Sequence, residues 1–143
     1  MSMRKLVAVC AIAVCGWAPA AAQNQERYKV RLATIAMDGG MRDAVAGSGS
    51  ATAVLAGMKL TINGTFEGLR SPATAARLHS GIAMGVRGAP LTEISITKGL
   101  SGTITGSVDL TADQVQSLRK GRLYIQISSE RAPEGNLWGW LVR

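Results

Sequence analysis

The feature of this sequence that most constrains its fold is a short alternation of apolar and polar residues that recurs along the chain. In residues 27–35, the apolar side chains Tyr28, Val30 and Leu32 alternate with basic ones. A period of two places successive side chains on opposite faces of a strand. We therefore expect this segment to be a half-buried strand whose basic face lies in water.

Seven further segments are expected to be strands, most of them alternating in the same way, and turns or the one predicted helix separate them. They cover residues 51–55, 59–66, 75–79, 92–96, 104–110, 122–128 and 136–143. Strands of about five to eight residues between closely spaced turns are typical of all-β folds. We predict an antiparallel β-sandwich with Greek-key-like connections, similar in architecture to immunoglobulin-like domains, while a closed barrel fits the pattern nearly as well.

The connections between these segments carry residues that favour turns. Residues 37–49 are rich in glycine, and residues 80–90 contain three glycines and Pro90, so both are expected to be exposed loops. A tighter turn is expected at residues 132–135. Asn63-Gly64 has two interpretations: a hairpin turn, or a bulge or close backbone approach within one continuous strand.

One helix is predicted, over residues 111–120. Thr111 and Gln114 have the spacing of a capping box, in which each side chain accepts a hydrogen bond from the other residue's backbone amide. Basic residues in the last turn suit the helix dipole, and Gly121 ends the helix. Val115 and Leu118 form a narrow apolar stripe, which is enough to dock the helix across the end of the sandwich.

The amino-terminal segment, residues 1–22, is predicted to be a secretory signal peptide. Two basic residues precede an apolar run at residues 6–14, and three alanines at residues 20–22 offer a cleavage site. The apolar run is too short to cross a bilayer as a helix. We expect residues 23–143 to form a single domain in the periplasm or outside the cell, with no transmembrane segment after cleavage.

Both cysteines, Cys10 and Cys15, lie inside this segment, so the exported domain would contain no disulfide. A domain of that length can bury roughly two thirds of its unfolded surface, and its core must therefore stabilise it. A membrane anchor and lipidation at Cys15 are alternative fates for the segment. Lipidation calls for a small residue at the preceding position, where this chain has Val14.

The charge of the exported domain is basic but dispersed. Without Arg4 and Lys5, the 16 basic residues fall to 14 against 9 acidic ones, a formal charge of +5. The one cluster is Arg119-Lys120-x-Arg122. Nucleic-acid binders show a basic stripe with aromatic residues for stacking, so we expect no nucleic acid as a partner. An anionic surface, a polysaccharide or an acidic partner stays open.

No arrangement of residues in the sequence indicates an enzyme. His79 is the only histidine, whereas a zinc or copper site usually needs three or four histidine, cysteine or carboxylate ligands. No Gly-x-Ser-x-Gly motif marks a nucleophile, and Glu130 and Glu134 share one expected loop without an opposing carboxylate. We predict no catalytic residue, no metal ligand and no cofactor, and a site built on His79 with carboxylates is the alternative.

Trp138 and Trp140 are two residues apart in the last expected strand, so their indoles point the same way. An inward pair would belong to the core, and an outward pair would form an aromatic platform for a sugar or a protein partner. Leu137 and Leu141 compete for the interior from the opposite face. The pattern alone leaves both alternatives open.

From about Lys29 to its end, the chain resembles the CHRD domain, a module that is repeated in chordin and occurs singly in exported bacterial proteins. The resemblance lies in residues 57–69, in residues 75–81, in Pro133-Glu134-Gly135 and, most specifically, in the motif Leu-Thr-x-x-Gln-x-x-x-Leu-x-x-Gly-x-Leu-Tyr-Ile of residues 110–125. It implies a superoxide-dismutase-like β-sandwich. In the animal proteins, the domain belongs to an extracellular binder of growth-factor ligands, a role that need not transfer to a single copy.

Three departures from the family pattern bear on the site. The family commonly has His-Ile-His where this chain has Arg77-Leu78-His79, and a His-Thr pair where it has Ser128-Ser129. It often has an arginine where this chain has Trp138. Three imidazoles on facing strands would make a metal site, and one does not.

We therefore expect an exported, non-enzymatic binding or interaction module whose partner is a protein or a glycan in the cell envelope or outside the cell. The candidate binding surface consists of Trp138, Trp140, Tyr124, His79 and Arg77. Two alternatives are an accessory or metal-dependent envelope enzyme, and a structural component of the envelope that pairs through strand edges.

Overall fold

The computed structural model describes residues 24–35 and 38–143, so the predicted signal segment lies outside the described residues. Eight strands, one α-helix and one short 3₁₀ helix form within the described part of the chain. The strands are β1 (Gln25–Ala33), β2 (Ser48–Ala56), β3 (Lys59–Glu67), β4 (Ala73–Ser80), β5 (Ala89–Ile96), β6 (Gly102–Asp109), β7 (Leu123–Ser129) and β8 (Ala132–Val142). The helices are η1 (Gly40–Asp43) and α1 (Ala112–Arg119).

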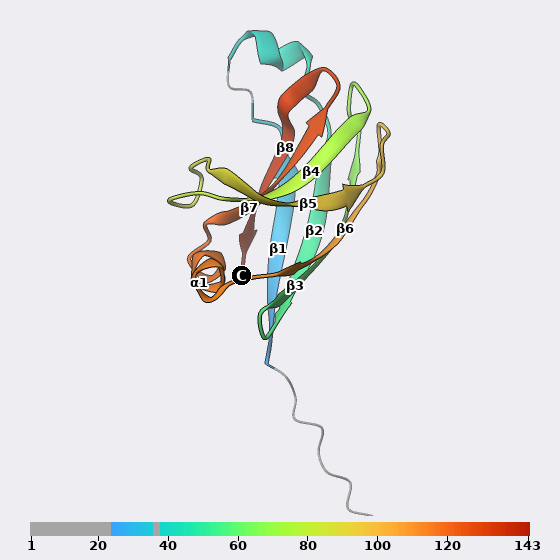
Figure 1. Ribbon diagram of the computed structural model, residues 1–143. Helices are drawn as coiled ribbons and strands as arrows, with labels where there is room; N and C mark the ends of the chain where they lie inside the picture. The colour runs from blue at the N-terminus through green and yellow to red at the C-terminus, as the bar shows by residue number, and fades with distance from the viewer. Residues whose placement is uncertain (1–23, 36–37) are drawn as a thin grey trace, which may run out of the picture.

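The eight strands close into one barrel in the order β1-β2-β3-β6-β5-β4-β7-β8 (Figure 1). All neighbouring strands are antiparallel. After β4, β5 and β6 have formed consecutive neighbours, the chain returns so that β7 lies beside β4, which is a Greek-key arrangement. The predicted all-β antiparallel fold with Greek-key connections and one short α-helix is confirmed.

The predicted β-sandwich, by contrast, is corrected to a closed barrel. One closing seam is short, because β5 pairs with β6 only at Ser95↔Thr105 and Ile96↔Ile104. The other seam joins β1 to β8, whereas β1 and β2 pair along their whole length. The barrel thus consists of two four-stranded sheets, β1-β2-β3-β6 and β5-β4-β7-β8. Each edge of one sheet is hydrogen-bonded over part of its length to an edge of the other, which closes the edges that a sandwich would leave open.

Alternation along each strand places one face in the barrel core. In β1, Tyr28, Val30 and Leu32 are at most 2% exposed, and the basic residues between them are exposed, as predicted. Apolar side chains of the other strands and of α1 fill the same core. Burying one large aliphatic side chain contributes about 1.5–3 kcal/mol, so a core shared by all strands can hold the domain together without disulfides.

The structure of the β2–β3 hairpin decides between the two interpretations of Asn63-Gly64. The chain turns at Gly57 and Met58, and Asn63 and Gly64 lie inside β3. A Cβ at Gly64 would lie 2.5 Å from the Cβ of Ala51 on the neighbouring strand. Gly64 therefore allows a close approach of two backbones within one continuous strand.

Helix α1 has the predicted cap and the predicted buried stripe. Thr111 Oγ1 accepts a hydrogen bond from the Gln114 amide at 3.2 Å, and Gln114 Oε1 accepts one from the Thr111 amide at 3.0 Å. Val115 and Leu118 join the barrel core. Neither helix in the described residues is long and apolar enough to cross a membrane.

The boundaries of three predicted segments change. The expected turn at residues 132–135 is wrong, because the chain turns at Glu130 and Arg131 and β8 already begins at Ala132. The expected loop at residues 80–90 is confirmed over residues 81–88. In the expected loop at residues 37–49, η1 forms a single turn and β2 begins at Ser48, and residue 37 lies outside the described residues.

Candidate binding site

A row of three rings, which we call the aromatic row, crosses the outer face of β4, β7 and β8. His79 pairs with Tyr124 across β4 and β7, and Tyr124 pairs with Trp140 across β7 and β8. The rings of His79 and Tyr124 stack with centroids 4.9 Å apart, and those of Tyr124 and Trp140 with centroids 4.8 Å apart. Opposed side chains on one face of an antiparallel sheet pack in this way, so the strand register assembles the row.

A second row on the same face places Trp138 beneath a cation. Arg77 pairs with Gln126, and Gln126 pairs with Trp138. Trp138 Nε1 donates a 3.0 Å hydrogen bond to Gln126 Oε1, and the Arg87 guanidinium lies 5.4 Å from the centroid of the indole. Arg87 also donates to the main-chain oxygen of Glu134 at 2.8 Å. Trp138 is consequently only 2% exposed.

All five residues of the predicted binding surface share this outer sheet face, but they are not equally accessible. Arg77 lies at its margin and forms a 3.1 Å ion pair with Glu93 of β5. Trp138 is buried, and Trp140 is partly exposed and stacks on Tyr124. The two tryptophans therefore belong to a covered sheet face and do not form an open aromatic platform.

A hollow of about 550 Å³ lies beside the two rows. His79, Arg87, Gly88, Tyr124, Gln126 and Glu134 line it. Arg87, Gln126 and Glu134 were not predicted from the sequence. The pattern contained a signal for Gln126, because it alternates with Tyr124 on the outward side of an apolar strand. Arg87 and Glu134 come from segments that only the tertiary fold brings together.

The main chain of Gly88 joins the edge of the hollow to the aromatic row. Its N–H donates to Tyr124 Oη at 3.0 Å, and its oxygen lies 3.0 Å from His79 Nδ1. A carbonyl oxygen can only accept, so His79 donates from Nδ1. A Cβ at Gly88 would lie 1.9 Å from the main-chain oxygen of Ser80, so this position requires glycine.

Two buried nitrogen atoms of the aromatic row have no hydrogen-bond partner among the described residues: His79 Nε2 and Trp140 Nε1. Burial, above all, lowers the pKa of His79, and the nearby guanidinium groups of Arg77 and Arg87 lower it further. At neutral pH the ring is therefore uncharged and its lone pair lies on Nε2. The row thus holds one unused acceptor and one unused donor, and leaving such atoms unpaired costs free energy.

The positions at which the family resemblance implies imidazoles lie on β4 and β7. Arg77 and His79 are on β4, and Ser128 is on the adjacent β7. In residues 24–35 and 38–143, no three histidine, cysteine or carboxylate side chains gather closely enough to hold a metal ion. Ser129, at the position of the family's threonine, accepts a 2.9 Å hydrogen bond from the buried Asn136.

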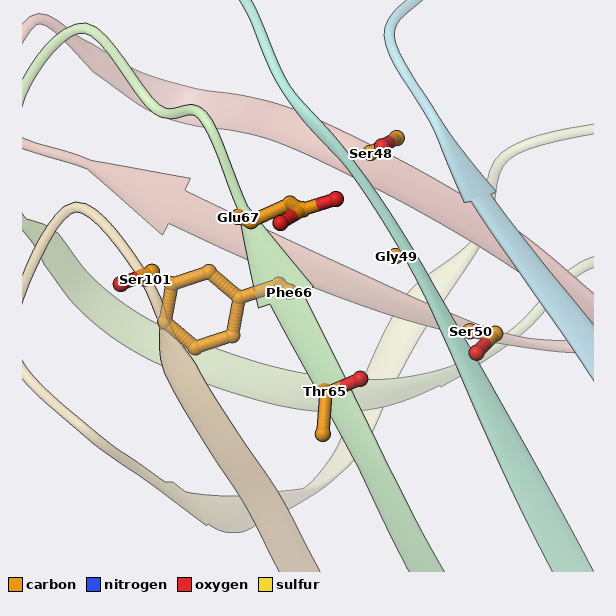
Figure 2. Close-up of a pocket in the computed structure, with 7 residues that line it drawn as sticks. All are labelled: Ser48, Gly49, Ser50, Thr65, Phe66, Glu67 and Ser101. Atoms are coloured by element: carbon orange, nitrogen blue, oxygen red, sulfur yellow. The ribbon is translucent and has the colours of Figure 1, made fainter.

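Another hollow, of about 390 Å³, lies on the other sheet (Figure 2). Ser48, Gly49, Ser50, Thr65, Phe66, Glu67 and Ser101 line it. These residues come from β2, β3 and the turn before β6, and Figure 2 shows hydroxyl groups and one carboxylate along them. The two buried side-chain nitrogen atoms without a partner in the described part of the chain belong to His79 and Trp140, and neither residue lines this hollow. The hollow beside the aromatic row is therefore the stronger candidate for a site.

These observations define a Greek-key barrel whose second sheet carries a hollow bounded by aromatic and hydrogen-bonding groups. A model of the CHRD domain family matches residues 34–141, which is most of the chain. The chain therefore belongs to the CHRD domain family, as its motifs indicated. No curated protein and no solved structure shows a significant match to it.

Proposed function

We propose that the protein is an exported, non-enzymatic binding module that holds a glycan in the hollow beside the aromatic row. The CHRD domain supports a binding role. The basic and apolar character of residues 1–22 supports export to the periplasm or the cell exterior. Binding takes place on the outer face of β4, β7 and β8, away from the packed interior of the barrel.

The observation that carries this proposal is the unpaired Nε2 of His79, one of the residues that line the hollow. His79 lines the hollow and is 8% exposed, and its Nε2 atom is buried without a partner among the described residues. Nε2 is covered in the free protein, so a ligand hydroxyl would reach it through a small rearrangement of the side chains around it and would then supply the hydrogen bond that the protein lacks. Satisfying a buried acceptor in this way contributes to affinity, since leaving it unpaired costs about 1–3 kcal/mol.

The remaining lining groups suit a ligand with many hydroxyls. Tyr124, Gln126 and Arg87, which carry a hydroxyl, an amide and a guanidinium group, all line the hollow. Together they provide donors and acceptors around a site that the rings of the aromatic row bound on one side. Ring faces next to a small number of directional polar groups are typical of small-ligand sites, and they suit the apolar and polar surfaces of a sugar.

Binding to an array of soluble oligosaccharides tests this proposal. His79→Phe keeps a ring in the aromatic row and removes Nε2 together with the Nδ1 bond to the Gly88 oxygen, so we expect it to weaken the binding of a captured glycan by about tenfold. Thr105→Val, on the exposed outer face of β6, is the matched control and should bind like the natural protein. Capture of no glycan, or equal capture by His79→Phe and the natural protein, would contradict the proposal.

A further inference from the structure

Exposed apolar side chains gather at one place on the described surface. Ile82, Met84 and Val86 in the β4–β5 loop are 78%, 57% and 41% exposed, and Val142 is 37% exposed. Met84 and Val142 line the same hollow of about 240 Å³, so the loop and the end of β8 are neighbours. Exposed apolar side chains are ordinary when they are scattered singly, whereas a cluster indicates a contact surface.

The other large exposed apolar residues of the described chain belong to three separate connections. They are Ile35, Met58 and Leu100.

The β4–β5 loop, residues 81–88, forms a narrow projecting lobe. A Cβ at Gly81 would lie 1.9 Å from the main-chain oxygen of Val86, so the two sides of the lobe approach each other closely. The amide of Val86 donates to Ala83 O at 3.1 Å, and Gly85 has a φ of +80°, which together form a tight turn at the tip. Figure 1 shows the loop projecting from the barrel on the same side as α1.

The basic cluster of the sequence lies against this lobe. The amide of Gly81 donates a 2.9 Å hydrogen bond to Arg122 O. The Met84 methyl group lies over Gly121, because a Cβ there would come within 2.5 Å of it. No ion pair among the described residues involves Lys120 or Arg122, so both are available to an external anion.

Two further arginines add to the positive charge of this region. Arg119 and Arg143 both pair with Glu26, at 2.7 Å and 2.8 Å. One carboxylate thus offsets two guanidinium groups. We call the surface formed by Ile82, Met84, Val86, Lys120 and Arg122 the loop face, and it carries the two cations Lys120 and Arg122.

We propose that the loop face binds an anionic lipid surface. The apolar tip of the loop enters the headgroup region, and Lys120 and Arg122 contact negatively charged headgroups. Apolar side chains beside cations are the composition of segments that lie in a membrane interface. A projecting tip favours a bilayer over a folded protein partner, because a specific protein interface needs a larger complementary surface. The loop face is separate from the glycan hollow, and either proposal can fail without the other.

Cosedimentation of the purified protein with lipid vesicles tests this proposal. One set of vesicles contains phosphatidylcholine alone, and the other contains phosphatidylglycerol as about one third of the lipid. We expect binding to the second set only, and weaker binding as the salt concentration rises. Lys120→Ser with Arg122→Ser should weaken binding on the order of 30-fold, which corresponds to about 1 kcal/mol for each cation near an anionic surface. Ile82→Ser should weaken it on the order of tenfold, through the loss of apolar burial.

Matched variants elsewhere on the surface distinguish binding by the loop face from nonspecific binding through any exposed cation or apolar side chain. Met58→Ser, at the β2–β3 turn, removes an apolar side chain that is 51% exposed, and Lys59→Ser with Lys98→Ser removes two other exposed cations. Both controls should bind vesicles like the natural protein, and unchanged melting temperatures would show that all variants fold. Equal binding to both vesicle sets, no binding at all, or binding that Ile82→Ser leaves unchanged would overturn the proposal. The last result would indicate a general polyanion partner.

Discussion

The two sheets of the barrel share one inner core, but β3 in the first sheet and β7 in the second differ in how far their outer faces are exposed to water. In β3, the outward residues Thr61, Asn63 and Thr65 are all exposed, and water can satisfy their polar groups. In β7, all seven residues are buried, including the outward Tyr124 and Gln126. A covered face must find a partner for each polar atom within the protein or a ligand. The covered sheet is therefore where the identity of each side chain is most constrained.

The largest expected difference between the sheets concerns Trp138. Trp138→Ala should lower the free energy of unfolding by about 3–5 kcal/mol, because it removes a buried indole and leaves a cavity beneath Arg87. Thr105→Ala, on the exposed outer face of β6, should change it by less than about 0.5 kcal/mol. Urea unfolding of the two variants measures both values. If the two variants lost the same free energy of unfolding, the outer faces of the two sheets would not differ in their contribution to stability.

A smaller effect is expected from Tyr124→Phe, which keeps the stacked ring and removes the hydroxyl group. The hydroxyl accepts from the Gly88 N–H and donates to the Gly88 oxygen, and losing both bonds should destabilise the protein by about 1 kcal/mol and speed hydrogen exchange at the Gly88 amide. Tyr28→Phe is the matched control on the first sheet, where the hydroxyl donates to Glu26. Protection of Gly88 that does not change in Tyr124→Phe would show that the loop is held by other contacts.

The smallest expected effect is a pH dependence near neutrality that belongs to the second sheet. The pKa of His79 is lowered in the folded protein from an ordinary 6.5, mainly by burial. The unfolded chain therefore takes up a proton first, and stability falls as the pH drops below about 6.5 and through the lowered pKa. His79→Phe should flatten this slope in unfolding measured across the pH range. A slope that persists in the variant would assign the effect to another group.

In the first sheet, the group with a shifted pKa is Glu26 of β1, which titrates at a lower pH than His79. Hydrogen bonds from Arg119 and then Tyr28 lower the pKa of Glu26 from 4.5 to about 2. Its contribution to stability is complete above pH 4.5 and is lost as the pH falls towards 2. Glu26→Gln should therefore flatten only this acid range and leave the slope near neutrality unchanged, which separates the two titrations.

Much of the fold could be predicted because its signals are local. The alternation of Tyr28, Val30 and Leu32 identifies a strand and its buried face without reference to other segments. Thr111 and Gln114 mark the start of α1 through bonds that span only three residues. Closure into a barrel was left open for two reasons. The pairing of β1 with β8 joins segments at opposite ends of the described chain, and β5 and β6, although consecutive, pair at only two positions.

The turn at residues 132–135 was predicted wrongly for a related reason. Gly135 was interpreted as a turn residue, and it has a φ of +129° inside β8. A Cβ there would lie 2.2 Å from Cζ2 of Trp138, so the glycine makes room for the indole. Local propensity detects the unusual backbone at such a position, and the tertiary packing that uses it is not visible in the sequence.

Some features of the candidate site also follow from local sequence, and others follow only from tertiary packing. The sequence alone determined that Trp138 and Trp140 face the same way, because strand geometry fixes the direction of residues two apart. It also determined that one histidine was available. Only the tertiary structure decided that Arg87 covers Trp138 and that Tyr124 stacks between His79 and Trp140. It also decided that His79, whose Nε2 has no partner among the described residues, lines a hollow. Those facts depend on which strands are neighbours and on how one loop folds back over them, and no local pattern encodes either.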